Sequence, residues 1–478
     1  MLHKIISDLK NFPEDACYEV SGKEYKNKDL YKYVCNIYHY ILDKNKDKKS
    51  VIVYGHKDIY MIASFIACSC AGVAYVPVDI SIPKDRREII INKINPNVII
   101  DKNIEEVMQK EDYKELDNIY MKDNDMYYII FTSGSTGEPK GVQITYANVK
   151  SCIKWLKQIC DIEKGVILNQ ANYSFDLSVA DIYLSLCTRS KHFVIEREVQ
   201  KDFTRLFNEL KKSKSDLAVF TPSFLNLLLT DKSFNEELMP NLKTILLCGE
   251  NLSENTVSRL FERFPNINLI NSYGPTECTF AVTSIRIEDS QDISIGIPKD
   301  GTEIFIIDDE FNEVVEGKTG EILITGESVG NGYIGNIKQN DNFVVYNGKK
   351  GYRTGDIGYY KNGKYYCIGR KDSQIKYKGY RIELLDIEST IDKLEFVEKS
   401  VVTVKKSDSG IVERIIAFVK LRQELSTKEI KVELKRLLPE YMIPMIRIID
   451  NIPLSQNGKI DAKKLLEDYN KWKNRLLI

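Results

Sequence analysis

The chain has 478 residues, of which 43% are hydrophobic and 29% are charged, and its formal net charge is −1. This length allows more than one domain and a substantial core, and the composition is that of an ordinary soluble globular protein. The balanced charge gives no reason to expect nucleic acid or an anionic membrane as a partner. The most apolar stretch, residues 61–78, is interrupted by serine, glycine and proline, so we expect no membrane insertion.

Ten cysteines are scattered between Cys17 and Cys367, and no Cys-x-x-Cys pair or neighbouring histidine predicts a zinc site. Residues 1–12 alternate apolar and charged side chains and do not resemble a leader peptide. We therefore expect reduced thiols and a cytoplasmic protein. With four histidines in the chain, chemistry centred on histidine is not expected.

Apolar strands and helical stretches alternate between residues 51 and 271. A helix expected over residues 59–70 lies between two expected strands, which predicts a βαβ unit. A second expected helix, residues 253–264, separates two later strands in the same way. We therefore predict an α/β fold with largely parallel sheets. The expected strands cover residues 51–54, 74–78, 98–100, 127–131, 218–220, 244–247 and 268–271.

From Glu303 onward the pattern changes to short strands separated by turns. Strands are expected at residues 304–307 and 320–325, and Asn362-Gly363 is a signal for a hairpin turn. This change predicts a smaller β-rich region beside the α/β part.

A domain boundary is predicted near residues 369–372, Gly-Arg-Lys-Asp. The chain beyond it has the pattern of a small α+β domain. We therefore predict a large domain over residues 1–371 and a small, mobile C-terminal domain over residues 372–478. The expected elements of the small domain are helices at residues 384–394 and 427–438 and strands at residues 401–405 and 415–421.

The most informative segment is residues 127–142, where an apolar strand feeds a loop of hydroxyl groups and glycines that ends in Pro-Lys-Gly. Such a loop can wrap a polyphosphate, because glycines let the backbone approach, hydroxyl groups donate hydrogen bonds and a lysine supplies positive charge. Its spacing is not that of a Walker A loop. A flexible Ser/Gly turn, the alternative, does not account for the strand before it. The candidate phosphate ligands are Thr132, Ser133, Gly134, Ser135, Thr136, Gly137 and Lys140.

Residues 330–335, Gly-Asn-Gly-Tyr-Ile-Gly, fit the Gly-x-Gly-x-x-Gly fingerprint of dinucleotide-binding folds, with Asp356 at the expected distance. A dinucleotide site would make the protein a nicotinamide or flavin enzyme. The fingerprint needs a helix that opens at the third glycine, and residues 336–342 have no apolar helical period. We therefore predict no dinucleotide site here.

The segment 127–142 resembles the phosphate loop of the adenylate-forming enzymes, the superfamily of acyl-CoA synthetases, luciferases and peptide-synthetase adenylation domains. Seven further segments match this family in the expected order, so the resemblance covers nearly the whole chain. They are residues 71–79, 271–277, 352–356, 369–372, 374–383, 438–444 and 457–461.

The resemblance implies how the chain would bind ATP and Mg²⁺. By analogy Asn271 meets the adenine amino group and Tyr273 stacks on the ring, while Thr276 touches the α-phosphate. Glu277 would hold Mg²⁺, since neutralising a pyrophosphate leaving group needs a metal and a hard carboxylate ligand. Taken alone, this segment also fits a Gly-Pro turn after a strand.

The later matches imply the remaining roles. Asp356 would accept hydrogen bonds from the ribose hydroxyl groups, and Arg370 would contact ribose or phosphate. Asp372 would be the hinge of the mobile domain. Lys459 would bridge the substrate carboxylate and ATP, which makes it a catalytic candidate with Thr276 and Glu277. An isolated Asn-Gly-Lys is otherwise typical of a surface turn.

Residues 169–186 narrow the class of substrate. Phe175-Asp176 resembles the motif of amino-acid-activating members, in which the aspartate pairs with the α-ammonium group; the alternative is a helix N-cap. With residues 131–146, 221–224 and 248–250, it resembles the D-alanine–D-alanyl carrier protein ligases, in which a cysteine at the place of Cys248 crowds the side-chain pocket. By position, the amino-acid pocket is expected to include Asp176, Leu177, Ala180, Phe220, Leu246, Cys248, Ser272 and Phe280.

Three of these residues depart from the pattern of that family. Ala180 is smaller, and Phe220 and Phe280 are larger, than we expect of a D-alanine ligase. Another small or medium amino acid therefore stays open as the substrate.

The resemblance implies a two-step ligase. It would form an aminoacyl adenylate from ATP and an amino acid, expected to be D-alanine, and then load the phosphopantetheine thiol of a separate carrier protein. One alternative is a stand-alone adenylation enzyme for another amino acid in a peptide or natural-product pathway. Asp176 argues against an acyl- or aryl-CoA ligase. The presence of Lys140, Glu277, Asp356 and Lys459 argues against a non-catalytic nucleotide-binding protein.

Overall fold

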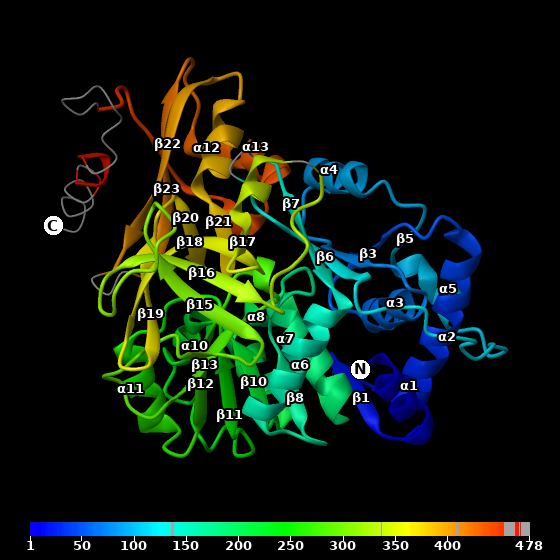
Figure 1. Ribbon diagram of the computed structural model, residues 1–478. Coiled ribbons are helices and arrows are strands. Elements are labelled where there is room, and N and C mark those ends of the chain that lie inside the picture. Colours follow the sequence, from blue (N-terminus) through cyan, green and yellow to red (C-terminus); the bar gives the residue numbers. More distant parts are fainter. Residues whose placement is uncertain (135–137, 336, 408–410, 454–463, 468, 470–478) are drawn as a thin grey trace. The chain divides into compact units, whose positions relative to one another are not determined.

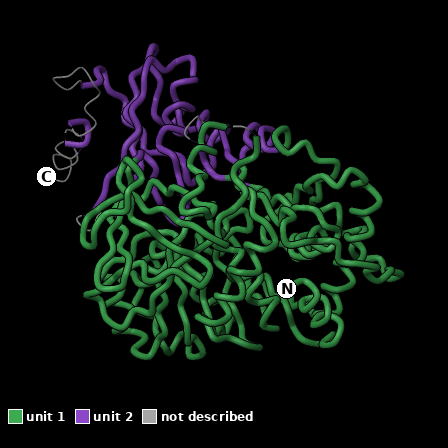
Figure 2. The backbone as a smooth tube through the Cα atoms, in the orientation of Figure 1, with its two compact units in different colours: residues 1–80, 91–131, 141–371 green, residues 81–90, 132–140, 372–478 purple. Residues whose placement is uncertain are grey.

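The computed structural model describes residues 1–134, 138–335, 337–407, 411–453, 464–467 and 469. The chain divides into two compact units, which Figure 2 distinguishes by colour. Unit 1 contains residues 1–80, 91–131 and 141–371, and unit 2 contains residues 81–90, 132–140 and 372–478. The longest segment of unit 2 begins at Asp372, the predicted hinge, whose movement stays a prediction. Within the described residues, we find no helix with the length and apolar character needed to span a bilayer.

The largest sheet of unit 1 has nine strands (Figure 1). Its six central strands, from β12 to β1, are parallel to their neighbours, while β2, β13 and β14 pair antiparallel at the two edges. In spatial order the strands are β14 (Ile297–Pro298), β13 (Thr283–Ile287), β12 (Asn268–Tyr273), β11 (Thr244–Leu247), β10 (Leu217–Phe220), β8 (Val166–Asn169), β9 (Lys191–Val194), β1 (Ala16–Val20) and β2 (Lys23–Lys26).

A second α/β sheet confirms the predicted βαβ unit. Helix α3 (Ile59–Cys70) connects the parallel strands β3 and β4, and all of its residues are buried. A helix that is apolar on every side is expected in the interior, which is where this one lies. The five strands are, in order, β5 (Ile99–Ile100), β3 (Val51–Gly55), β4 (Tyr75–Asp79), β6 (Met126–Thr132) and β7 (Lys140–Thr145).

Among the remaining helices of the α/β part, α7 (Leu177–Thr188) is buried along nearly its whole length, as α3 is, and several others begin at hydroxyl or carboxylate caps. The side chains of Thr145, Asp202, Thr221 and Ser253 each accept a hydrogen bond from a backbone N–H in the first helical turn. These helices are α1 (Leu2–Asn11), α2 (Asn27–Lys44), α4 (Lys84–Ile94), α5 (Glu105–Met108), α6 (Tyr146–Cys160), α7 (Leu177–Thr188), α8 (Arg197–Gln200), α9 (Phe203–Ser213), α10 (Pro222–Leu228) and α11 (Glu254–Arg263), with 3₁₀ turns η1 (Lys102–Ile104) and η2 (Thr276–Cys278).

The nine-stranded sheet separates two hydrophobic cores. In β10, Val219 belongs to one core and Phe220 to the other. In β11, Leu246 belongs to the core of Val219, and Leu247 belongs to that of Phe220. This alternation follows from strand geometry, because successive side chains point to opposite faces of the sheet.

An antiparallel β-rich region follows, as predicted. Asn362 and Gly363 connect β18 to β19 and both have positive φ, 50° and 77°, which is the conformation that tight hairpin turns require. The glycine fingerprint at residues 330–335 precedes a 3₁₀ turn, η3 (Lys338–Asn342), and a strand, so the described residues after it form no dinucleotide-binding helix. The strands are β15 (Thr302–Ile307), β16 (Gly320–Gly326), β17 (Phe343–Tyr346), β18 (Lys349–Lys361) and β19 (Lys364–Arg370).

Unit 2 has its own α+β core, although its segments are far apart in the sequence. Arg86, at the beginning of α4, forms an ion pair of 2.7 Å with Asp386, and their side chains are 9% and 0% exposed. Its elements are β20 (Gln374–Tyr377), β21 (Tyr380–Glu383), α12 (Leu384–Asp392), β22 (Val397–Lys406), β23 (Val412–Leu421), α13 (Thr427–Leu437), η4 (Glu440–Met442) and β24 (Met445–Ile448).

Candidate active site

A buried carboxylate in unit 1 is held from both sides. Asp356, in β18, is 3% exposed. The hydroxyl of Tyr273 donates a hydrogen bond of 2.6 Å to its Oδ2, and the guanidinium of Arg370 donates one of 2.6 Å to its Oδ1. Burial, with the charge of Asp356, raises the pKa of Tyr273 well above its ordinary value, so the phenol stays a donor. The carboxylate is thus oriented, and its remaining lone pairs can accept hydrogen bonds from a diol such as ribose.

Asn271 lies two residues before Tyr273 in β12, and its orientation is fixed by a backbone carbonyl. Its Nδ2 donates a hydrogen bond of 2.8 Å to the carbonyl of Ser294. The bond uses the donor side of the amide and leaves Oδ1 as an acceptor, which is the group that an exocyclic amino group such as that of adenine requires. Next to it, Ser272 Oγ donates a hydrogen bond of 2.7 Å to the carbonyl of Leu247 and so ties β12 to β11.

Glu277 follows in η2, and its side chain is fully buried. The hydroxyl of Tyr333 donates a hydrogen bond of 2.5 Å to Glu277 Oε1 and lies 3.1 Å from the hydroxyl of Tyr352. A carboxylate oxygen is the kind of ligand that Mg²⁺ prefers, so Glu277 fits the predicted metal role. The described residues contain no cluster of three or more histidine, cysteine or acidic side chains suited to a metal.

The segment that carries Thr276 and Glu277 ends in an unusual backbone turn. Thr279 and Phe280 have φ values of 63° and 70°, which are costly for residues with bulky side chains. The turn brings the chain back beside Gly274, where a Cβ would lie 2.6 Å from the Cα of Ala281. The glycine and the turn together fix the position of η2 at the end of β12.

The expected amino-acid pocket is only partly brought together. Leu177, Ala180, Leu246, Cys248 and Phe280 all belong to one hydrophobic core, and Cys248 Sγ lies 3.8 Å from the carbonyl oxygen of Phe280. The structure does not bring Phe220 to this face, because it points to the second core together with Leu247. Its neighbour in β10, Val219, lies beside Leu246 and faces the first core.

Asp176 lies directly before α7, and its side chain is partly exposed. Its backbone carbonyl accepts a hydrogen bond of 3.0 Å from Val179 N. Among the described residues, its carboxylate does not make the helix-capping bond that was the alternative role for this residue. This geometry leaves the predicted role of Asp176, pairing with an ammonium group, compatible with the structure.

The predicted phosphate loop belongs to unit 2, and its described residues contact the β20–β21 hairpin there. Ser133 Oγ donates a hydrogen bond of 2.9 Å to the carbonyl of Arg381 and accepts one of 3.1 Å from Glu383 N. Lys140 Nζ lies 3.7 Å from Glu383 Oε1. A Cβ at position 134 would lie 2.1 Å from the carbonyl oxygen of Glu138, so the loop requires glycine there.

Four of the predicted site residues lie outside the described part of the chain, and the role of Asp372 stays a prediction. Ser135, Thr136, Gly137 and Lys459 are outside the described residues. Asp372 Oδ1 accepts a hydrogen bond of 3.1 Å from Gln374 N at the beginning of β20, and its hinge role stays a prediction.

The structure places three residues at these sites that the sequence patterns did not indicate. They are Tyr333, which contacts Glu277; Glu383, which pairs with Lys140; and Val219, which lies beside Leu246. Strand alternation could have found Val219, because β10 and β11 are parallel neighbours. The other two contacts join segments that are distant in sequence, and no local pattern signals them.

The residues predicted to bind ribose, adenine and a metal are thus oriented by hydrogen bonds, and with two α/β sheets and a β-rich region they fit an enzyme that binds an adenine nucleotide. The chain belongs to the AMP-binding enzyme family, whose model matches residues 7–334. It is 37% identical to the D-alanine–D-alanyl carrier protein ligase of Listeria welshimeri, over 98% of this chain and 99% of that protein. It is 39% identical to the ligase of the same name from Bacillus licheniformis, over 88% of this chain and 90% of that one. The predicted family is thus confirmed.

Solved structures support the same fold. The adenylation domain AlmE of Vibrio cholerae, in complex with glycyl-adenosine-5′-phosphate, matches with a TM-score of 0.85 and 21% identity, over 98% of this chain and 97% of that one. The o-succinylbenzoate CoA synthetase of Bacillus subtilis matches with a TM-score of 0.83 and 19% identity, over 97% and 98% of the two chains. At these identities the likeness concerns the fold alone, and it confirms the predicted fold class.

Proposed function

We propose that this chain activates D-alanine with ATP and transfers it to the phosphopantetheine thiol of a separate carrier protein. The observation that carries the nucleotide half of the proposal is the buried Asp356 carboxylate, oriented by Tyr273 and Arg370. The choice of D-alanine and of a carrier protein rests on the relatives, which are named for that reaction and match over nearly the full chain.

In the first step, a carboxylate oxygen of the amino acid attacks the α-phosphorus of ATP. The bond from that phosphorus to the bridging oxygen breaks, and pyrophosphate leaves with the bond's electron pair. Asn271 and Asp356 hold adenine and ribose, and Thr276 contacts the α-phosphate. Glu277 would hold Mg²⁺, which neutralises charge on the departing pyrophosphate. Catalysis in this step is mainly positioning and electrostatic stabilisation of the phosphoryl oxygens.

Two lysines complete the first step. Lys140, at the end of the phosphate loop, supplies positive charge to the phosphates, and Lys459 bridges the substrate carboxylate and ATP. Asp176 pairs with the α-ammonium group of the amino acid. An acyl or aryl acid has no such cation, so it would leave this carboxylate without a matching charge.

In the second step, the carrier thiol attacks the acyl carbon of the adenylate. A thioester forms, the mixed anhydride bond breaks, and AMP leaves. We propose that the segment beyond Asp372 turns between the two steps and moves Lys459 away from the reacting groups. A hinge of this kind would let one site serve two reactions.

The test is amino-acid-dependent exchange of pyrophosphate into ATP, measured with D-alanine, L-alanine, glycine, the other L-amino acids and several aryl acids. A clear preference for D-alanine over L-alanine supports the proposal. Preference for a different amino acid keeps the adenylation mechanism and overturns the choice of D-alanine. If none of the amino acids supports pyrophosphate exchange, the proposed function is overturned. Free coenzyme A is offered in parallel as the acceptor, and efficient thioester formation with it would exclude the carrier-protein step.

A further inference from the structure

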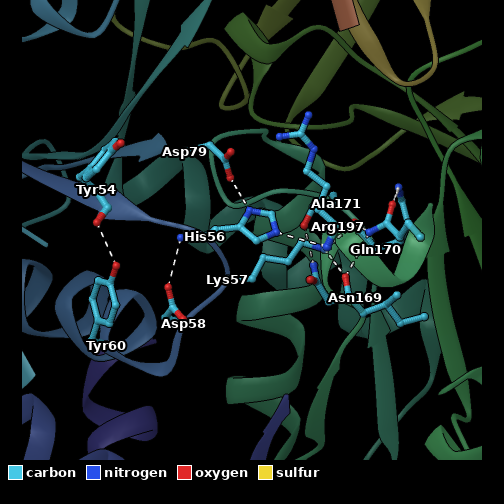
Figure 3. A network of polar contacts seen from close by, with 12 residues as sticks. Tyr54, His56, Lys57, Asp58, Tyr60, Asp79, Asn169, Gln170, Ala171 and Arg197 are labelled. Atoms are coloured by element: carbon cyan, nitrogen blue, oxygen red, sulfur yellow. Dashed lines mark hydrogen bonds and ion pairs between the residues drawn. The ribbon is translucent and has the colours of Figure 1, made fainter. Parts of the chain in front are cut away.

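A lysine in the interior of unit 1 joins the carboxyl ends of two parallel strands. Lys57, in the loop between β3 and α3, is fully buried. Its Nζ donates hydrogen bonds of 2.6 Å to the carbonyl of Gln170 and 2.8 Å to that of Ile195. These are the first residues after β8 and β9. Figure 3 shows Lys57 beside the chain that leaves β8 at Asn169, Gln170 and Ala171.

A cation is well placed at this point of the fold. Carbonyl groups just beyond the end of a parallel strand no longer have the regular ladder to pair with, and buried carbonyl groups need donors. The side chain of Gln200 supplies a second donor to the same two carbonyls, at 3.0 Å from Gln170 O and 3.1 Å from Ile195 O. The first carbonyl after β8 and the first carbonyl after β9 each accept hydrogen bonds from both Lys57 and Gln200.

The loop that carries Lys57 is itself held in place. The hydroxyl of Tyr18, from β1, donates a hydrogen bond to the carbonyl of Lys57 and lies 3.1 Å from the hydroxyl of Tyr173. Next to Lys57, His56 Nδ1 lies 2.6 Å from Asp79 Oδ2, at the end of β4. The network shown in Figure 3 thus connects the second α/β sheet to the segment that leaves β8.

That segment leads directly to the amino-acid motif. Residues 170–175 connect β8 to Asp176 and α7. Asn169 Nδ2 donates hydrogen bonds of 3.1 Å to the carbonyl of Ala171 and 2.8 Å to Asp181 Oδ2, which fixes the same segment against α7. The position of Asp176 therefore depends on a short chain whose first carbonyl is bound by Lys57.

We propose that Lys57 is a positioning residue for the amino-acid substrate: by fixing the carbonyls of Gln170 and Ile195, its amino group sets the position of the segment that carries Asp176. This inference rests on the proposed role of Asp176 in binding the substrate's ammonium group. Lys57 is 0% exposed and acts on the substrate through the backbone. It controls affinity for the amino acid and leaves affinity for ATP unchanged.

The charges around Lys57 agree with this structural role. Burial lowers its pKa to about 7, and electrostatic interactions with Asp181, Asp79 and Glu196 oppose that shift. Burial also raises the pKa of Asp181 well above its ordinary value. These carboxylates come from α7, β4 and the segment before α8. Two histidines also face this region, His56 on the same loop and His192 on β9. With a pKa of about 7, the charged and neutral forms of the amino group are both present near neutral pH, and each has enough donors for the two carbonyls.

The experiment compares Lys57→Met with the wild-type protein in pyrophosphate exchange, using whichever amino acid the wild type prefers. Methionine keeps the volume of the side chain and removes its donors. We expect KM for the amino acid to rise at least tenfold and KM for ATP to change less than twofold. Lys299→Met is the matched control, since Lys299 is also buried in unit 1 and donates a hydrogen bond of 2.6 Å to Ser151 Oγ. We expect this control to leave the ratio of KM for the amino acid to KM for ATP as it is in the wild type.

A second variant keeps the test valid if Lys57→Met does not fold. Gln200→Leu removes the other donor to the same carbonyls from a partly exposed position, and we expect a smaller rise in the same KM. Hydrogen–deuterium exchange of residues 170–176 should be faster in every folded variant that loses a donor. The inference is overturned if the folded variants keep the wild-type KM for the amino acid, or if hydrogen–deuterium exchange of residues 170–176 is unchanged in them. Absence of exchange activity in the wild type, by contrast, would count against the proposed function.

Discussion

The hydroxyl of Tyr273 donates a hydrogen bond of 2.6 Å to Asp356 Oδ2 across 83 positions of sequence. Because Arg370 binds the other oxygen, the carboxylate has one orientation before a nucleotide arrives. Such preorganisation lowers the entropic cost of binding.

We expect Tyr273→Phe to raise KM for ATP about tenfold, because a hydrogen bond to a charged group contributes about 1.5–3 kcal/mol. KM for the amino acid should not change. Pyrophosphate exchange at varied ATP and varied amino acid separates the two constants. Tyr365→Phe, which removes a hydroxyl that donates to the carbonyl of Ile304, is the control. Equal effects of the two variants on KM for ATP would contradict this role of Tyr273.

Glu277→Gln should raise the Mg²⁺ concentration needed for half-maximal exchange at least tenfold, since a neutral amide is a weaker ligand for a hard cation. Tyr333→Phe should raise it less, because the carboxylate remains and loses one donor. Magnesium titrations of both variants check this order. Glu303→Gln, at an ion pair with the partly exposed Lys349, is the control. A normal magnesium requirement in Glu277→Gln would remove this residue from the metal site.

Comparing Cys248→Ala with Phe220→Leu tests which face of the nine-stranded sheet contacts the substrate side chain. Cys248 faces the core that contains Ala180 and Phe280, whereas Phe220 faces the other core. We expect Cys248→Ala to raise the exchange rate with L-alanine relative to D-alanine at least tenfold, because it enlarges the space for the side chain. Phe220→Leu should keep the wild-type ratio. A changed ratio in Phe220→Leu would place this residue at the substrate after all.

His192→Phe should make the protein less sensitive to acid. Burial, together with the charge of Lys57, lowers the pKa of His192 to about 3. In the unfolded chain a histidine binds a proton near pH 6.5, so the folded state loses stability as the pH falls from about 6.5 toward 3. One such group contributes a slope of up to about 1.4 kcal/mol per pH unit.

Urea unfolding between pH 7 and pH 4 tests this effect. The free energy of unfolding of His192→Phe should fall less steeply than that of the wild type. His3→Gln, at an exposed position, should keep the wild-type slope. Parallel curves for wild type and His192→Phe would show that His192 does not stay neutral in the folded protein.

Lys459→Ala should abolish pyrophosphate exchange and leave transfer from preformed adenylate to the carrier largely intact, because the role proposed for this lysine is confined to the first step. Single-turnover transfer from synthetic D-alanyl adenylate measures the second step separately. Lys435→Ala, at an exposed position of α13, is the control. Equal loss of both steps in Lys459→Ala would refute the assigned role.

Local patterns predicted the elements well where one physical signal dominated. The expected helix at residues 59–70 has the observed bounds of α3, because a mostly apolar stretch there ends before Gly72. Helix α1 was missed, although Leu2, Ile5, Ile6 and Leu9 have helical spacing and are all buried.

The candidate site was harder to predict than the fold. Motif order made Asp356, Arg370 and Glu277 candidates, because each lies in a segment with a local signature, and their roles stay predictions. Partners such as Tyr333 depend on how distant segments meet, and sequence distance carries no information on that. To predict where Phe220 points, one must combine the alternation of side chains along β10 with the pairing of Val219 and Leu246 in the neighbouring strand.

The ion pair between Arg86 and Asp386 has a consequence for exchanging parts between related enzymes. A fragment that begins at Asp372 would contain the buried carboxylate and lack the guanidinium that neutralises it, since Arg86 comes 300 positions earlier in the chain. Removing one member of a buried pair typically costs about 3–5 kcal/mol. A chimera that receives residues 372–478 from a relative therefore needs a compatible residue at position 86, far from the junction.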